Sequence, residues 1–266
     1  MRARTLVVLC LQGLLGLQLG AQVINPPSGQ SDTTEWQGWC GLSLEWQPVK
    51  SVKLALNEQW RWDNDFGDFD RQIHQLDVTW SPRWNAFSKA QSLGAALRHT
   101  TRPDNKGDIQ GKDRFLRWQV EYTAQVEPGR WSMEGRLRYQ RQSALALKDE
   151  SDPADYSSRV QTRIKGSVGY NIKGWKWDPE FSVERFLVQV PEGWPSDGSW
   201  RFRLGSSKRM GKRQKLRIFL QRDAQGRYTP TGWGGLDDFR LKGSTEWTVG
   251  VTWRYRIKSK RKKKEA

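Results

Sequence analysis

The stretch TEWTVGVTWRYRIK, residues 245–258, decides the fold because its residue types alternate. From Trp247 to Ile257 every odd position is apolar or aromatic, whereas the positions between them hold Thr, Gly or Arg. Side chains of a β-strand point alternately to its two faces. The stretch therefore predicts a strand with one apolar face and one basic face.

The same two-residue alternation recurs along the chain. It is strong in residues 36–46, 51–62, 115–127, 130–142 and 158–172, and weaker near 71–82, 90–101, 178–190, 199–209 and 213–222. Strands of soluble proteins usually have about five or six residues. The longer runs found here are typical of strands that cross a bilayer in a barrel, which need about 9–11 residues.

The connections between these runs alternate in length. Short ones lie at 47–50, 128–130, 173–176 and 210–213, a somewhat longer one lies at 82–89, and long polar ones lie at 63–70, 102–113, 143–157, 190–198 and 223–240. Tight periplasmic turns and long external loops are typical of outer-membrane barrels. The sequence therefore predicts an all-β fold, an antiparallel up-and-down transmembrane β-barrel that is porin-like in outline.

The strand count needs one adjustment. Together with 245–258, the runs give eleven strands, but bacterial single-chain barrels have even numbers. We therefore expect about twelve strands, with ten as the alternative. A twelfth strand is expected in 28–36 or 233–244.

The composition agrees with alternating strands. The chain has 266 residues, of which 28% are charged and 16 are Trp, and its mean hydropathy is −0.83. Many aromatic residues with low hydropathy are expected when apolar residues are spread singly along strands. Among them, Cys40 falls on an apolar face, where we expect a small buried side chain.

The N-terminus predicts export. Arg2 and Arg4 precede an apolar stretch that ends in small residues at Ala21, the pattern of a secretory signal peptide. We expect cleavage near Ala21 and a location in the bacterial outer membrane. The predicted organisation is a signal peptide at 1–21, an N-terminal linker at 22–35, the barrel at 36–258 and a basic tail at 259–266.

Three segments carry a family resemblance. WCGLSLEWQPVKSVKLALNEQWRW (39–62), WRFRLGSSKRMGKRQKLRIFLQRD (200–223) and WTVGVTWRYRIK (247–258) resemble the bacteroidete family described as domain of unknown function 2490. The resemblance covers roughly residues 36–258. It implies an exported outer-membrane barrel, handled by the outer-membrane assembly machinery, and implies no activity. Barrels of this kind usually end on an aromatic residue, whereas SKRKKKEA ends this chain.

The polar faces of the strands are rich in basic residues. We expect the following to line the lumen: Lys53, Arg61, Arg117, Arg136, Arg138, Arg159, Arg163, Lys165, Arg201, Arg203, Lys215, Arg217, Arg254 and Arg256. Acidic residues share these faces: Glu45, Asp77, Glu121, Glu134, Glu180 and Glu184. One interpretation is a passive channel that favours small anionic solutes. The other is a structural barrel filled with paired charges, without a conducting path.

Aromatic residues gather near the strand ends. We expect them at the lipid interface, in contact with outer-membrane lipid and lipopolysaccharide: Trp36, Trp46, Trp60, Trp62, Trp80, Trp131, Trp177, Trp247, Trp253 and Tyr255.

Two alternatives to a non-enzymatic barrel remain. His74 and His99 lie on apolar faces near the outer rim of neighbouring strands, as an outer-membrane lipid hydrolase using His99 or His74 requires. Only Thr100 and Thr101 adjoin His99, so we expect no catalytic residue. The other alternative is a soluble basic nucleic-acid-binding β protein, suggested by the isoelectric point near 10.1. The signal peptide and long strands argue against nucleic acid, and no cofactor or metal site is expected.

Overall fold

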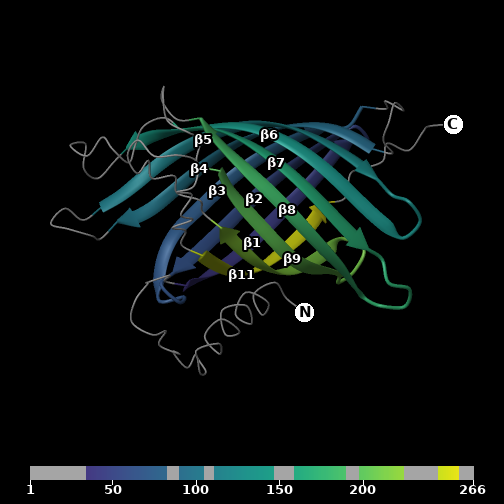
Figure 1. Cartoon of the computed structure of the whole chain (residues 1–266). Helices are drawn as coiled ribbons and strands as arrows, with labels where there is room; N and C mark the ends of the chain where they lie inside the picture. Colours follow the sequence, from purple (N-terminus) through teal and green to yellow (C-terminus); the bar gives the residue numbers. More distant parts are fainter. Residues whose placement is uncertain are drawn as a thin grey trace, which may run out of the picture. The chain divides into compact units, whose positions relative to one another are not determined.

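The computed structural model describes residues 34–82, 90–104, 111–146, 159–189, 198–224 and 245–257. Within them, eleven strands form a closed barrel (Figure 1). Among the described residues, no helix is long and apolar enough to cross a membrane. The strands are β1 (Thr34–Val49), β2 (Val52–Asp63), β3 (Asp68–Trp80), β4 (Ala90–Asp104), β5 (Gly111–Val126), β6 (Trp131–Ala146), β7 (Arg159–Tyr170), β8 (Trp177–Gln189), β9 (Gly198–Arg209), β10 (Gln214–Ala224) and β11 (Thr245–Ile257).

The barrel closes through a parallel pair of strands. Each strand is antiparallel to the next one in the chain. When an odd number of strands alternates in direction, the first and the last point the same way. β1 and β11 therefore pair in parallel, from Thr34↔Thr245 to Trp46↔Ile257.

This closure corrects the expected strand count and sheet type. The barrel has eleven strands in the described residues, not twelve or ten, and it is mixed rather than purely antiparallel. Because β1 and β11 are hydrogen-bonded to each other, the sheet has no edge that a twelfth strand could extend. Of the segments suspected to hold one, 233–244 lies outside the described residues, and 28–36 is described from Thr34, where β1 begins.

The two ends of the barrel differ in their connections. We call the end that carries connections 50–51, 127–130 and 210–213 the short-turn end. β11 also finishes there, where the backbone N–H of Arg256 donates to the carbonyl of Arg213 over 2.8 Å. β1 begins at the opposite end. The β2–β3 connection at that opposite end is 64–67, shorter than the expected 63–70.

The β2–β3 connection folds onto the outer side of β1. Asn64, Asp65 and Phe66 have φ of 48°, 55° and 70°, a strained conformation for Phe66. A Cβ on Gly38 would lie 2.6 Å from the ring of Phe66. Gly38 therefore leaves the space that the Phe66 ring occupies beside the seam between β1 and β11.

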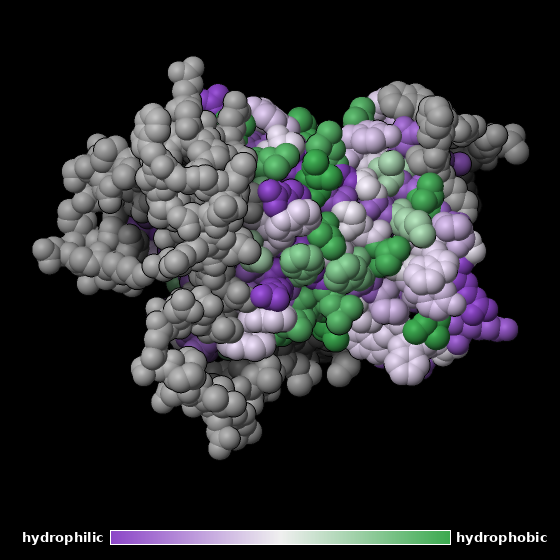
Figure 2. Space-filling view, in the orientation of Figure 1, coloured by the Kyte–Doolittle hydropathy of each residue, from purple (hydrophilic) through white to green (hydrophobic). Residues whose placement is uncertain are grey.

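The distribution of side chains is the reverse of a soluble core. In the described residues, 33 large hydrophobic side chains are exposed, and only Ala55, Ile73, Phe186 and Phe219 are buried apolar residues. Buried side chains are mainly Gln, Arg, Glu, Ser and Thr. Figure 2 shows hydrophobic side chains across the middle of the visible strands. The alternation predicted from residues 245–258 thus gives a barrel with a polar interior and an apolar outer face.

The register of the closing pair can be tested by cross-linking. Leu44 of β1 lies directly opposite Tyr255 of β11 on the outer face. In a Cys40→Ala background, we expect Leu44→Cys with Tyr255→Cys to form a disulfide on mild oxidation, because directly paired Cα atoms lie within the range that a disulfide spans. Non-reducing gels after denaturation measure the cross-link.

The matched control is Leu44→Cys with Val251→Cys, because Val251 lies four residues from Tyr255 on the same strand and faces outward as well. Equal cross-linking of both pairs, or cross-linking of the control alone, contradicts this closure.

Candidate functional site

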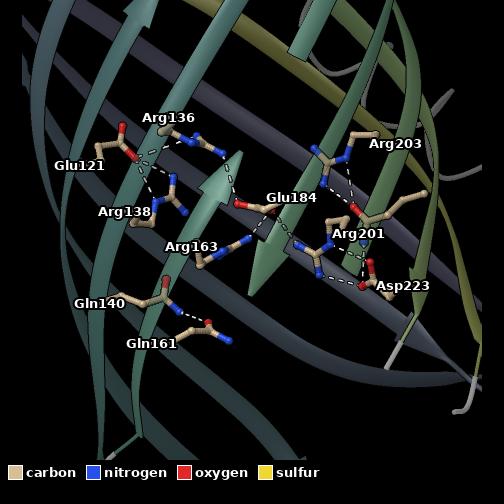
Figure 3. A network of polar contacts seen from close by, with 11 residues as sticks. Glu121, Arg136, Arg138, Gln140, Gln161, Arg163, Glu184, Arg201, Arg203 and Asp223 are labelled. Atoms are coloured by element: carbon tan, nitrogen blue, oxygen red, sulfur yellow. Dashed lines mark hydrogen bonds and ion pairs between the residues drawn. The ribbon is translucent and has the colours of Figure 1, made fainter. Parts of the chain in front are cut away.

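The inside of β5–β10 carries a set of polar side chains, which we call the polar layer. Ion pairs and hydrogen bonds join its members, except that within the layer Gln140 and Gln161 bond only to each other. Figure 3 shows the members of the layer pointing toward one another, and they come from β5, β6, β7, β8, β9 and β10. Alternation places them there, since each occupies the non-apolar position of its strand. The polar layer consists of Glu121, Arg136, Arg138, Gln140, Gln161, Arg163, Glu184, Arg201, Arg203, Gln221 and Asp223.

Glu184 lies at the centre of the polar layer. Its Oε2 lies 2.7 Å from Nη2 of Arg163 and 3.9 Å from Nη1 of Arg201, and its Oε1 lies 3.6 Å from Nη2 of Arg136. The Glu184 side chain is only 6% exposed. One buried carboxylate thus holds guanidinium groups from β6, β7 and β9.

Two further carboxylates extend the layer to either side. Arg201 donates two hydrogen bonds of 2.7 Å to Asp223, one to each carboxylate oxygen. Arg138 donates from Nε and Nη2 to Oε2 of Glu121, over 3.0 and 2.7 Å. The bidentate Arg201–Asp223 pair fixes orientation as well as charge. The layer is therefore a chain of alternating cations and anions across the barrel.

Three aromatic side chains also point inward. Phe186 lies beneath the guanidinium groups of Arg163 and Arg201, at 4.4 and 4.9 Å from its ring centre. Trp39 and Phe219 meet edge to face at 5.2 Å. A Cβ on Gly250, opposite Phe219 on β11, would lie 2.0 Å from its ring. Phe219 therefore occupies space over the neighbouring strand β11 that only glycine leaves open.

A second polar group lines β2–β4. Arg98 Nε donates to Gln75 over 2.5 Å, and the amides of Gln75 and Asn57 both donate to Asp77. Arg98 also lies directly opposite Arg117 of β5. Like charges directly opposite each other repel, so this pair makes an unfavourable contact inside the barrel.

The interior is hollow at the short-turn end. A cavity of about 1100 Å³ is bounded on one side by Glu121 and Arg136 of the polar layer. Eight basic residues line it, against five acidic ones: Lys53, Arg130, Arg136, Lys165, Arg209, Lys215, Arg217 and Arg254, with Glu121, Glu127, Glu134, Asp178 and Glu180. We call this space the short-turn cavity, and its lining is net basic.

The basic residues expected in the lumen occupy three places. Arg136, Arg138, Arg163, Arg201 and Arg203 belong to the polar layer. Lys53, Lys165, Lys215, Arg217 and Arg254 line the short-turn cavity. Arg256 lies 3.7 Å from Glu45 at that end, Arg61 stacks on Trp39 at 4.4 Å, and Arg117 faces Arg98. The side chain of Arg159 lies outside the described part of the chain.

Several interior residues were missed at the level of sequence. Trp39, Phe186 and Phe219 interrupt the polar face of their strands, which is the signal that could have identified them. Arg98 and Asp223 were also missed as interior residues. The acidic residues Glu45, Glu121 and Glu184 each pair with basic groups from other strands.

The outer aromatic residues form two groups. Near the end opposite the short turns lie Trp36, Trp60, Trp62 and Trp247, and near the short-turn end lie Trp46, Trp80, Trp131, Trp177, Trp253 and Tyr255. Trp36 and Trp247 stack at 5.9 Å across the closing seam. These groups mark the two borders of the apolar outer face.

His74 and His99 lie side by side on the outer face. They are paired in register across β3 and β4, and their rings stack at 6.0 Å. Thr101 shares their face, whereas Thr100 is buried inside. Among the described residues, no group of His, Cys, Asp and Glu is arranged to hold a metal ion.

A search of protein-family models finds none that matches this chain, and a search of curated proteins finds no match. The resemblance to the domain of unknown function 2490 family therefore stays a prediction.

The role of Glu184 can be tested by its removal. Glu184→Ala leaves Arg136, Arg163 and Arg201 without their shared carboxylate. Removing one partner of a buried ion pair costs about 3–5 kcal/mol, so we expect the free energy of unfolding in detergent micelles to fall by about that much, measured by urea titration of tryptophan fluorescence.

Glu134→Ala is the matched control. Glu134 lines the short-turn cavity and makes no ion pair within 4.0 Å among the described residues. We expect its replacement to cost less than about 1 kcal/mol. Equal losses in both variants would show that Glu184 is not the centre of the network.

Proposed function

We propose that this chain is an exported outer-membrane β-barrel with a structural role and a lumen closed by the polar layer. The observation that carries this proposal is the polar layer inside a sheet whose outer face is apolar. Its partners are outer-membrane lipid, lipopolysaccharide and the assembly machinery. Membership of the domain of unknown function 2490 family is part of the same proposal.

The outer face supports a lipid environment. Monomeric soluble proteins rarely expose apolar patches larger than a few hundred Å², whereas this barrel exposes large hydrophobic side chains on every strand. The strands have 11 to 16 residues, enough to cross a bilayer at a tilt. The two aromatic groups match the girdles of membrane barrels.

The connections support an orientation. Short turns of outer-membrane barrels face the periplasm. In that orientation the short-turn cavity opens toward the periplasm and β11 ends there, while β1 begins at the outer side.

The interior supports a closed lumen. Beyond the short-turn cavity, the polar layer and the rings of Trp39, Phe186 and Phe219 extend into the interior. The short-turn cavity would then be a pocket with one open end. Its net basic lining favours small anionic solutes over cations.

A soluble nucleic-acid-binding role is less well supported. Such a protein needs basic and aromatic side chains together on an accessible surface. Here Arg136, Arg163 and Arg201 are turned inward, and the outer face carries the apolar residues.

Planar-bilayer recordings test the closed lumen. We expect the wild-type protein to give no stable current steps, and the triple variant Arg163→Ala, Glu184→Ala, Arg201→Ala to give steps because the centre of the polar layer is removed. The reversal potential in a potassium chloride gradient should show chloride preference, since Arg98, Arg117 and Arg203 remain.

Lys165→Ala is the control, because Lys165 lines the cavity outside the polar layer. It should stay closed. Circular dichroism confirms that each variant keeps its β-structure. Large current steps from the wild type would contradict closure.

A further inference from the structure

A row of titratable side chains crosses the apolar outer face. Glu58 of β2, His74 of β3 and His99 of β4 are directly opposite one another in register. All three stand where alternation predicts apolar residues, beside Leu56 and Leu76. Ionisable groups that face lipid are rare and usually have a function.

Glu58 and His74 form a carboxylate–imidazole dyad. Glu58 Oε2 lies 2.6 Å from Nδ1 of His74. The His74 side chain is 43% exposed, and His99 stacks on it with 25° between the ring planes. A carboxylate on Nδ1 fixes the tautomer that carries its proton there, which leaves Nε2 free as a base.

The position of the dyad along β2 and β3 determines which part of a lipid molecule can reach it. Toward the short-turn end, the next outward row is Leu56, Leu76 and Leu97, whereas toward the other end it is Trp60, Gln72 and Thr101. The dyad thus lies next to the aromatic group at the end opposite the short turns, at the border of the apolar outer face. If the barrel spans the outer membrane as proposed above, this border meets the region where acyl chains join their headgroups.

We propose that the Glu58–His74 dyad is a general-base site for hydrolysis of acyl esters in membrane lipids. Nε2 of His74 takes a proton from water as the water oxygen bonds to the ester carbonyl carbon. The tetrahedral intermediate then breaks its bond to the alcohol oxygen, which receives that proton from the imidazolium. The products are a fatty acid and a lipid that has lost one acyl chain.

The neighbouring residues define the roles within this site. His74 is the catalytic residue, and Glu58 is a positioning residue. Among the described residues, the positions on this face that border His74 and His99 hold no Ser or Cys. Thr101 lies one outward position beyond His99 but belongs to the row paired with Gln72. Water, rather than a side-chain hydroxyl, is therefore the nucleophile.

The test uses the full chain, purified in mild detergent and shown to be folded by circular dichroism. It is mixed separately with phosphatidylethanolamine and with lipopolysaccharide, and released fatty acids are measured by mass spectrometry. Release from one lipid and not the other identifies the source of the ester. His74→Ala should lower the rate about 100-fold or more, and Gln72→Ala, on the same strand and face, should leave it unchanged.

Separate measurement of kcat and KM distinguishes the proposed role of Glu58 from a purely structural one. Glu58→Gln should lower kcat about tenfold with KM unchanged, since the carboxylate acts on the base and not on substrate binding, and Glu58→Asp should recover part of the loss. Thr101→Ala should retain activity.

No release by a folded wild type from either lipid overturns this inference while leaving the barrel proposal intact, because folding is measured separately. Full activity of His74→Ala, or loss of activity in Thr101→Ala, also overturns it. A water-soluble protein without an apolar outer face would instead contradict the proposed membrane location.

Discussion

The structure depends on closing a ring of backbone hydrogen bonds. A sheet whose faces have opposite polarity can leave no edge unpaired in an apolar medium, where each unpaired N–H or C=O costs several kcal/mol. Here the ring is closed by β1 and β11 over the whole length of β11. Because hairpins reverse direction at every step, eleven strands make that last pair parallel, which is slightly less favourable per residue than an antiparallel pair but leaves no edge.

Closure also determines what the interior must contain. The two-residue period sends half of every strand inward, and in a barrel of this width those side chains meet across the lumen. Arginine suits this space, because its fork reaches a carboxylate on another strand while its face stacks on a ring. Arg201 does both, with Asp223 on one side and Phe186 on the other. The filling is uneven, which leaves the cavity at the short-turn end beside a dense polar layer.

Sequence predicted the strands better than their number or their interior. Alternation in 245–258 and 115–127 identified strands, since period and polarity are local properties. Whether the number of strands is odd or even depends on the whole chain. The alternation within one run of residues does not show whether another segment, such as 233–244, adds a strand. The rule that bacterial barrels have even strand numbers led to the wrong expectation of twelve or ten strands. The ring of Phe219 fills the space that Gly250 leaves on the neighbouring strand. This contact can be recognised only when the register of β10 and β11 is known. Glu58 stands at an apolar position of the 51–62 alternation, and its partner, His74, lies on another strand.

The central claim is that this chain forms a closed barrel in the outer membrane, and heat modifiability tests it most directly. Membranes are fractionated, solubilised in mild detergent and run on gels with and without boiling. The account predicts that the protein lies in the outer-membrane fraction and gives a compact unboiled band whose mobility changes on boiling, because a closed hydrogen-bonded ring resists mild detergent. A protein found in the soluble fraction, with the same mobility before and after boiling, would contradict it.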